Sequence, residues 1–246
     1  MKLLVKQFSH ILIILISIQG VNAQSGSLLI PISTNAKAEI VKHTYYQLEY
    51  DETHEQAAWV FYMLTPEFIN GTAERKNKFK PDKLVTTGSA ALIDYKGSGY
   101  DRGHLCPAGA MKVNQKAMDE SFYMSNMSPQ LPAFNRGKWK QLESQVRKWV
   151  AKEDTLFVVT GPIFTDSLGV IGVNKVTIPA YYYKVIYDPT DEKKMIAFIM
   201  PNRKIENSIL DYVVTVNEVE LKTGIDFFSA LPDELELKLE SEIVSW

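Results

Sequence analysis

Short runs of apolar residues along the chain predict five β-strands. These runs lie at residues 44–50, 57–64, 156–160, 181–187 and 195–200. The run at 57–64 is almost continuously apolar, which suits a buried strand. Asp188 and Pro189 begin a turn-forming linker between the last two runs, so these two strands are expected to form a hairpin.

Helical spacing of apolar residues is clearest at residues 135–152, where they recur at intervals of three or four and give one buried face. A second helix is predicted between Thr215, which opens a capping box, and Gly224, a natural helix stop. Pro232 is placed to open a third helix. The helices therefore follow or flank the predicted strands without a regular alternation.

Mixed strands and helices without βαβ regularity predict a single α+β domain, with a central, mostly antiparallel sheet flanked by helices. We assign this domain to residues 40–246 and interpret residues 24–39 as an extended lead-in, because they lack periodicity. Residues 65–82 form a polar, basic loop before the segment that carries the candidate chemistry. Its charges are either solvated surface or contacts to phosphate.

The first 23 residues are typical of a secretory signal peptide. Lys2 and Lys6 precede a short apolar run at 11–16, and the small residues Val21 and Ala23 follow it. This run is too short to span a membrane comfortably, which favours a cleaved signal over an uncleaved anchor. We expect a secreted or periplasmic protein that has no stable membrane association after cleavage.

The charge balance excludes a strongly basic nucleic-acid binder. The chain of 246 residues has a net charge of −2, and loss of the two signal lysines leaves 25 basic and 29 acidic residues. A protein that binds a polyanion and then releases it needs only a local basic groove. Cys106 is the only cysteine, so no intrachain disulfide is possible, and we expect its side chain to be buried.

The tetrad Asp101-Arg102-Gly103-His104 and the later Asn135 supply the residue types that phosphodiester hydrolysis needs. A neutral histidine accepts a proton near physiological pH, arginine matches phosphate geometry, and an amide oxygen binds a hard cation. A lone histidine is more often structural, which is the simplest interpretation of His43 and His54.

Several ordered motifs around the tetrad resemble the DNA/RNA non-specific endonuclease family, the ββα-metal (His-Me finger) nucleases. The similar segments are GYDRGHL at 99–105, FYMSNMSPQ at 122–130, FNRGKW at 134–139, and residues 142–143, 159–162, 178–182, 214–218 and 223–224. Similarity thus extends over about residues 40–232. The resemblance implies that the α+β domain contains a ββα-metal catalytic motif.

This resemblance also implies roles for single residues. His104 corresponds to the general base and Asn135 to the direct metal ligand, although asparagine also fits a plain helix N-cap. Glu143 matches an acidic position associated with the water shell of the metal; a solvated helix position is the alternative. Arg102 corresponds to an arginine that organises the site and binds phosphate.

Two further positions are assigned less specifically. Asn126 matches a polar residue of the family site, and Arg75 lies where the family has a phosphate-contacting arginine. For Asp101 we expect hydrogen bonds to nearby backbone, and for Gly103 a tight backbone path.

The resemblance implies a Mg²⁺-dependent endonuclease, with Mn²⁺ as a possible substitute. Its substrates would be DNA and RNA, cut with little sequence preference to leave 5′-phosphate and 3′-hydroxyl ends, and a homodimer is possible. Two alternatives stay open: a nuclease restricted to one type of nucleic acid, and a non-catalytic nucleic-acid-binding protein on the same scaffold.

Overall fold

The computed structural model describes residues 29–190 and 192–246. The predicted signal peptide at 1–23 and the start of the lead-in therefore lie outside the described residues. Within the described ranges, no helix is both long enough and apolar enough to cross a membrane.

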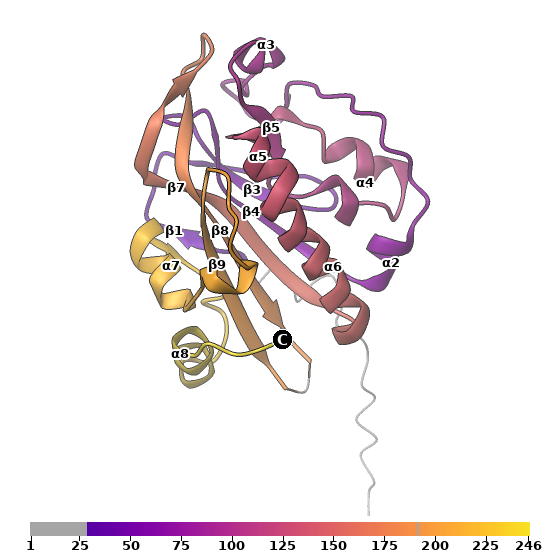
Figure 1. The fold of residues 1–246 in the computed structure, drawn as a ribbon, viewed down its shortest axis with the longest axis vertical. Helices are drawn as coiled ribbons and strands as arrows, with labels where there is room; N and C mark the ends of the chain where they lie inside the picture. Colours follow the sequence, from indigo (N-terminus) through magenta and orange to yellow (C-terminus); the bar gives the residue numbers. More distant parts are fainter. Residues whose placement is uncertain (1–28, 191) are drawn as a thin grey trace, which may run out of the picture.

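A seven-stranded antiparallel sheet forms the centre of the molecule, as we predicted (Figure 1). In spatial order its strands are β10 (Val213–Val214), β9 (Lys194–Pro201), β8 (Val176–Asp188), β7 (Leu156–Ile171), β4 (Gln56–Leu64), β3 (Gln47–Asp51) and β2 (Glu39–Lys42). Consecutive strands β7, β8 and β9 are joined as hairpins, which confirms the hairpin predicted around Asp188.

Both faces of this sheet are buried, which explains why its strands are almost continuously apolar. Along β4, the side chains of Val60 and Tyr62 pack into one apolar cluster, while Trp59 and Phe61 pack into another on the opposite face. The same alternation runs along β7, β8 and β9. A strand covered on both faces needs apolar side chains at odd and at even positions alike.

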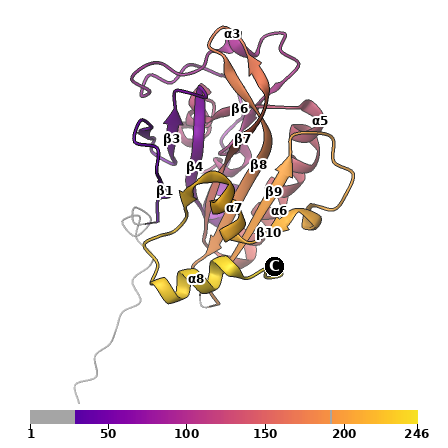
Figure 2. The same cartoon turned by 90° about the vertical axis from the view of Figure 1, so that its left-hand side faces the viewer.

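Helices cover the two faces of the sheet. On one face lies α6 (Lys140–Glu153), whose Leu142 and Val146 join the first cluster. On the other lie α7 (Val216–Thr223) and α8 (Asp233–Ser241), drawn in front of the sheet in Figure 2. The Thr215 hydroxyl caps α7 and Gly224 ends it with φ 68°, as the sequence predicts.

Two small sheets and several short helical turns complete the described fold. The small sheets pair β1 (Ile32–Ser33) with β11 (Ile225–Asp226), and β5 (Asp101–His104) with β6 (Met127–Gln130). The short α-helices are α2 (Pro66–Asn70), α3 (Leu92–Tyr95), α4 (Gln115–Glu120) and α5 (Pro132–Phe134). Further single turns lie at Ala108–Ala110, Met124–Asn126, Asn135–Trp139 and Ile209–Tyr212.

Several predicted boundaries are wrong. The strand predicted at 44–50 begins only at Gln47, because the preceding residues form a turn in which the His43 amide donates to the Tyr46 carbonyl. The strands predicted from 156 and 181 belong to a longer hairpin whose exposed tip lacks apolar alternation. The lead-in contains β1, and the loop predicted at 65–82 contains α2.

Candidate active site

The tetrad forms the strand β5, which pairs antiparallel with β6 and is followed by the helical segment from α5 to α6. Two strands and a helix thus adjoin one another in chain order, the arrangement that the ββα resemblance implies. At Gly103 an added Cβ would lie 2.3 Å from side-chain atoms of Gln130. Only glycine allows β6 to approach this closely.

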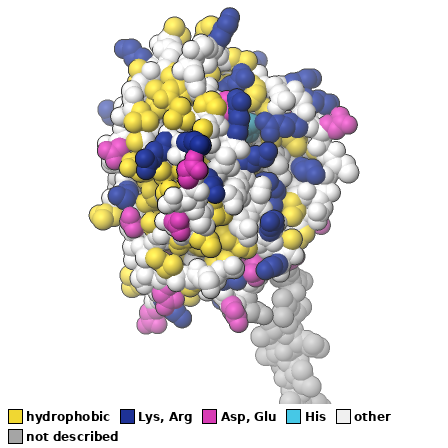
Figure 3. Space-filling view, in the orientation of Figure 1, with side chains coloured by type: hydrophobic (Ala, Val, Ile, Leu, Met, Phe, Trp, Pro, Cys, Tyr) yellow, Lys and Arg dark blue, Asp and Glu magenta, His cyan; other side chains and the backbone are white. Residues whose placement is uncertain are grey.

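A cavity of about 920 Å³ opens between β5, α6 and the loop before α3. It is lined by two acidic side chains, Asp101 and Glu143, and by six basic ones. The basic residues are Arg75, Lys78, Arg102, Arg136, Lys140 and Arg147. Figure 3 shows basic side chains gathered around a histidine on this face of the molecule. A chain with negative net charge therefore carries a local basic groove, which is all that binding and release of a polyanion requires.

His104 lies in the wall of this cavity and is only 8% exposed. Burial, together with the positive charges of Arg75 and Arg102, lowers the pKa of His104 to about 3. Among the described residues, Nε2 of this ring has no hydrogen-bond partner. The imidazole is consequently neutral at pH 7, which is the form that accepts a proton.

Two phenylalanine rings, which sequence analysis missed, hold the cationic side chains around His104. The Arg102 guanidinium lies 4.1 Å from the Phe79 ring centroid, and that of Arg75 lies 5.3 Å from the Phe122 centroid. The His104 ring packs edge-on against Phe122 at 4.9 Å. The signal was the aromatic residue at 79 within a basic stretch, a pattern typical of nucleic-acid sites.

Asp101 connects the tetrad to the helical segment. Its carboxylate accepts hydrogen bonds from Asn135 Nδ2 at 2.9 Å and from two nitrogens of Arg136 at 2.8 and 2.6 Å. Burial alone would raise its pKa, but these donors hold the pKa of Asp101 below its usual value. The prediction that Asp101 bonds to nearby backbone is wrong, because its carboxylate binds the side chains of Asn135 and Arg136.

Asn135 is not a helix N-cap. It has helical backbone angles (φ −55°, ψ −49°) and follows α5 directly, inside a wider π-helical turn that ends where α6 begins. Gly137 breaks the helical geometry within this turn (φ −98°, ψ −115°). The predicted helix at 135–152 is therefore regular only from Lys140, and wider turns of this kind often occur at functional sites.

The residues present fit a hard divalent cation. Because Nδ2 of Asn135 is bound to Asp101, its Oδ1 is oriented as an acceptor, and Asn135 lines the cavity together with Glu143. In the part of the chain that the structure describes, no three His, Cys, Asp or Glu side chains form a metal cluster. A single neutral oxygen ligand suits a cation that keeps most of its water, as Mg²⁺ does.

Asn126 lies outside the cavity. Its amide is completely buried, accepting a hydrogen bond from the Cys106 amide at 2.8 Å and donating to the Cys106 and Ser121 carbonyls at 2.9 Å each. It thus fixes the backbone directly after His104. Cys106 is buried, as expected.

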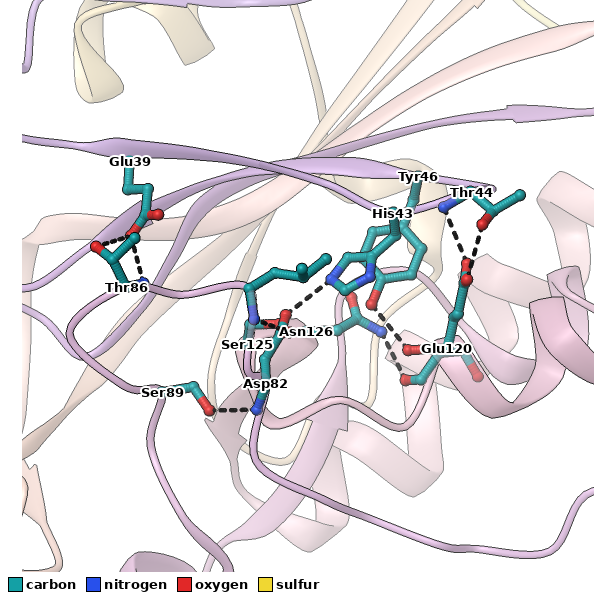
Figure 4. A network of polar contacts seen from close by, with 12 residues as sticks. Glu39, His43, Thr44, Tyr46, Asp82, Thr86, Ser89, Glu120, Ser125 and Asn126 are labelled. Carbon is teal, nitrogen blue, oxygen red and sulfur yellow. Dashed lines mark hydrogen bonds and ion pairs between the residues drawn. The ribbon is translucent and has the colours of Figure 1, made fainter.

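His43 also lies outside the cavity, in a network of polar contacts with Asp82 and Ser125 (Figure 4). Its Nε2 lies 2.7 Å from Asp82 Oδ2, and the Ser125 hydroxyl donates to the same oxygen at 2.6 Å. His54 stacks on Phe164 at 3.7 Å. Neither histidine contributes to the groove, which agrees with the structural interpretation from sequence.

A second buried amide attaches the turn between β6 and α5 to the main sheet. Asn202, which follows β9, accepts a hydrogen bond from the Leu131 amide at 2.8 Å and donates to the Pro129 and Pro179 carbonyls at 3.0 and 2.9 Å. The turn between β6 and α5 is thereby tied to the end of β9. The position of Asn135, four residues after Leu131, depends on this attachment.

Comparisons with known proteins agree with the motifs. The family model described as DNA/RNA non-specific endonuclease matches residues 25–234. Mitochondrial nuclease EXOG from Mus musculus is 34% identical over 215 residues, which cover 80% of this chain and 58% of that protein. Nuclease C1 from Cunninghamella echinulata var. echinulata is 36% identical over 204 residues, which cover 76% of this chain and 81% of that protein.

The fold is similar to a solved structure as well. A chain in a crystal structure of the EndoG/EndoGI complex, which concerns the mechanism of EndoG inhibition, matches with a TM-score of 0.78 and 32% identity. The match covers 87% of this chain and 95% of that one. In contrast, the chain spans less than two thirds of the length of the mouse EXOG relative.

Proposed function

Because the chain belongs to the DNA/RNA non-specific endonuclease family, a family of metal-dependent hydrolytic nucleases, we propose that it cleaves DNA and RNA internally with little sequence preference. One observation carries this proposal: His104, Arg102, Arg75, Asn135 and Glu143 line a single basic cavity. A groove of this charge attracts the phosphate backbone without reading the bases.

In this proposal His104 is the general base. The neutral imidazole takes a proton from a water molecule, and the resulting hydroxide attacks phosphorus in line with the departing 3′-oxygen. The pKa of about 3 in the free protein makes the ring a weak base. A bound phosphate adds negative charge beside the ring and raises that pKa, so the base gains strength only when substrate is present.

Arg102 and Arg75 hold the phosphate. Their guanidinium groups are stacked on Phe79 and Phe122, which reduces the side-chain freedom that binding would otherwise remove. Both groups flank His104 and neutralise charge on the nonbridging oxygens as hydroxide approaches. The two aromatic rings thus position the binding residues without contacting phosphate themselves.

Asn135 would hold the metal ion through Oδ1, with Asp101 fixing the orientation of its amide and Glu143 binding water of the metal shell. We propose Mg²⁺, because one neutral oxygen leaves the remaining ligand positions to water. When bound, such an ion stabilises negative charge on the phosphate and on the leaving oxygen. The products would carry 5′-phosphate and 3′-hydroxyl ends.

The test incubates the purified protein with plasmid DNA and with RNA, in Mg²⁺ or in EDTA. We expect both polymers to be cut only with the metal, and His104→Ala to lose about a hundredfold or more in rate because it lacks the base. His54→Ala is the matched control, since His54 lies outside the cavity. Full activity of His104→Ala would overturn the assignment, and binding of both polymers without turnover would favour the non-catalytic alternative.

We also propose export through cleavage of the signal peptide after Ala23. The support is the charge and hydropathy pattern of residues 1–23. Expression of the complete chain, followed by mass determination of the protein outside the cytoplasm, tests this. A mature protein that begins at Gln24 is expected; full-length protein retained in the cell would refute it.

A further inference from the structure

A second hollow of about 330 Å³ adjoins the catalytic cavity. Leu92, Asp101 and Arg102 line both spaces, so the two lie side by side. The second hollow is otherwise lined by Tyr95, Lys96 and Tyr100. None of these three residues has a role in the mechanism described above. The hollow combines aromatic and aliphatic walls with two cationic side chains.

Tyr100 lies two residues before Arg102 along the chain. It directly precedes β5, and in an extended chain alternate side chains share one face. Arg102 and His104 therefore share one side of β5, and Tyr100, two residues before Arg102, lines the second hollow together with it. Alternate residues are about 6.5 Å apart along a strand. The tyrosine is thus offset from the phosphate-binding arginine by about the length of one extended nucleotide.

The structure holds Tyr100 firmly while leaving part of its ring accessible. The ring is half-buried against the apolar cluster that contains Tyr95 and Met127. Gly97 and Gly99, with φ of 73° and 85°, make the turn that presents it. A rigid, partly exposed aromatic ring binds a flat partner at low entropic cost.

The polar groups around the ring favour a nucleotide over an apolar ligand. The Tyr95 hydroxyl is buried and has no hydrogen-bond partner among the described residues. Lys96 and Arg102 bring positive charge, while the Asp101 carboxylate is already occupied by Asn135 and Arg136. An aromatic ring beside free cations is the combination that binds a base together with its phosphate.

We propose that this hollow is a base subsite, in which Tyr100 stacks on an unpaired nucleobase next to the phosphate that is cut. The inference rests on the proposed nuclease function and adds a substrate preference to it. A base within a duplex is already stacked and paired, and must be unstacked before it can enter. The base subsite therefore favours single-stranded nucleic acid over duplex, without selecting a particular base.

The experiment uses single-stranded DNA octamers that each lack one base, at a different position in each octamer. For the wild-type protein in Mg²⁺, we expect kcat/KM to fall about tenfold at one linkage, which lies at a fixed distance from the missing base. The reason is that one stack between a base and an aromatic ring is lost. Tyr100→Phe keeps the ring and should retain this pattern. Tyr100→Leu should cut the intact octamer about tenfold more slowly and be indifferent to the missing base.

Tyr181→Leu is the matched control, because Tyr181 is an exposed tyrosine that lines neither hollow. A wild-type protein that cuts every octamer equally, or a Tyr100→Leu variant that keeps the wild-type pattern, would overturn the base subsite while leaving the nuclease function intact. Absence of all cleavage would refute the nuclease function instead. Octamer affinities measured in EDTA then test the base subsite independently of cleavage. Equal affinities for intact and abasic octamers would contradict the base subsite.

Discussion

The two faces of the main sheet carry different clusters of charged side chains. On the face with α6 and β5, six basic side chains surround a cavity that contains only two acidic ones. On the face with α7 and α8, burial raises the pKa values of Glu220, Glu236 and Glu240, and repulsion from neighbouring carboxylates contributes to the shift. The net charge of −2 describes neither face. Local charge, rather than the total, decides where a polyanion binds.

The carboxyl groups on the two faces also differ in whether a neighbouring side chain binds them. In the cavity, Asp101 is bound by two neighbouring side chains, and its pKa is lowered. On the opposite face, Glu240 is buried with Oε1 unpaired among the described residues, and burial with the neighbouring carboxylates raises its pKa to about 8. Substitutions on the cavity face should therefore change activity, and substitutions on the other face should change stability.

The largest effect is expected for Asp101→Asn, which keeps the size of the side chain and removes its charge. Asn135 loses the partner that orients its amide, so activity should fall about 10- to 100-fold and half-maximal activity should need more metal. Stability should change little, because Arg136 is exposed and such ion pairs contribute little. The measurement is the cleavage rate over a range of Mg²⁺ concentrations. Asp211→Asn is the control, because Asp211 lies outside the cavity. An unchanged titration curve would contradict the role of Asp101.

A smaller effect is expected for Arg75→Ala. Loss of one phosphate contact should raise KM for nucleic acid severalfold and reduce the slope of log KM against log salt concentration by about 1. The measurement is KM at several salt concentrations. Arg203→Ala removes an exposed arginine outside the cavity and should leave the slope unchanged. Equal slopes for Arg75→Ala and the wild type would show that Arg75 does not contact phosphate.

The smallest effect is expected for Glu240→Gln, and only in stability. The folded protein keeps a proton on this carboxyl up to a pH of about 8, against an ordinary value of 4.5, so folding loses stability as the pH rises through this window. The melting temperature of the variant should thus be about 2 °C or more above that of the wild type at pH 9. At pH 4 the two melting temperatures should be equal. Melting curves at both pH values test this. A gain of equal size at pH 4 would exclude titration as the cause, and nuclease activity should stay unchanged.

Long apolar runs made most of the main sheet predictable from the sequence. The strands β4 and β9 were predicted to within one residue at each end, because burial on both faces leaves a continuous apolar signal. The helix α7 was predicted from its capping residues alone. By contrast, β5 and β6 contain DRGH and MSPQ, which have no apolar period. Their pairing depends on the close approach at Gly103, a tertiary contact that local patterns do not encode.

The candidate site was predictable in part, through motifs rather than periodicity. Five of the six predicted site residues line the cavity, whereas Asn126 is buried outside it. The stacking of the arginines on Phe79 and Phe122 was missed, since it joins residues from separate segments of the chain. The acidic cluster was missed for the same reason, because α8 brings its carboxyl groups beside α7 only in the folded chain.

The attachment through Asn202 has a consequence for the order in which the protein is made. The residues that line the catalytic cavity lie between positions 75 and 147, so they leave the ribosome well before Asn202 does. Until β8 and β9 have been synthesised, the turn before Asn135 lacks the side chain that holds it. The cavity therefore reaches its final shape late in translation. A chain cut short before Asn202 would lack this attachment even though it contains every residue that lines the cavity.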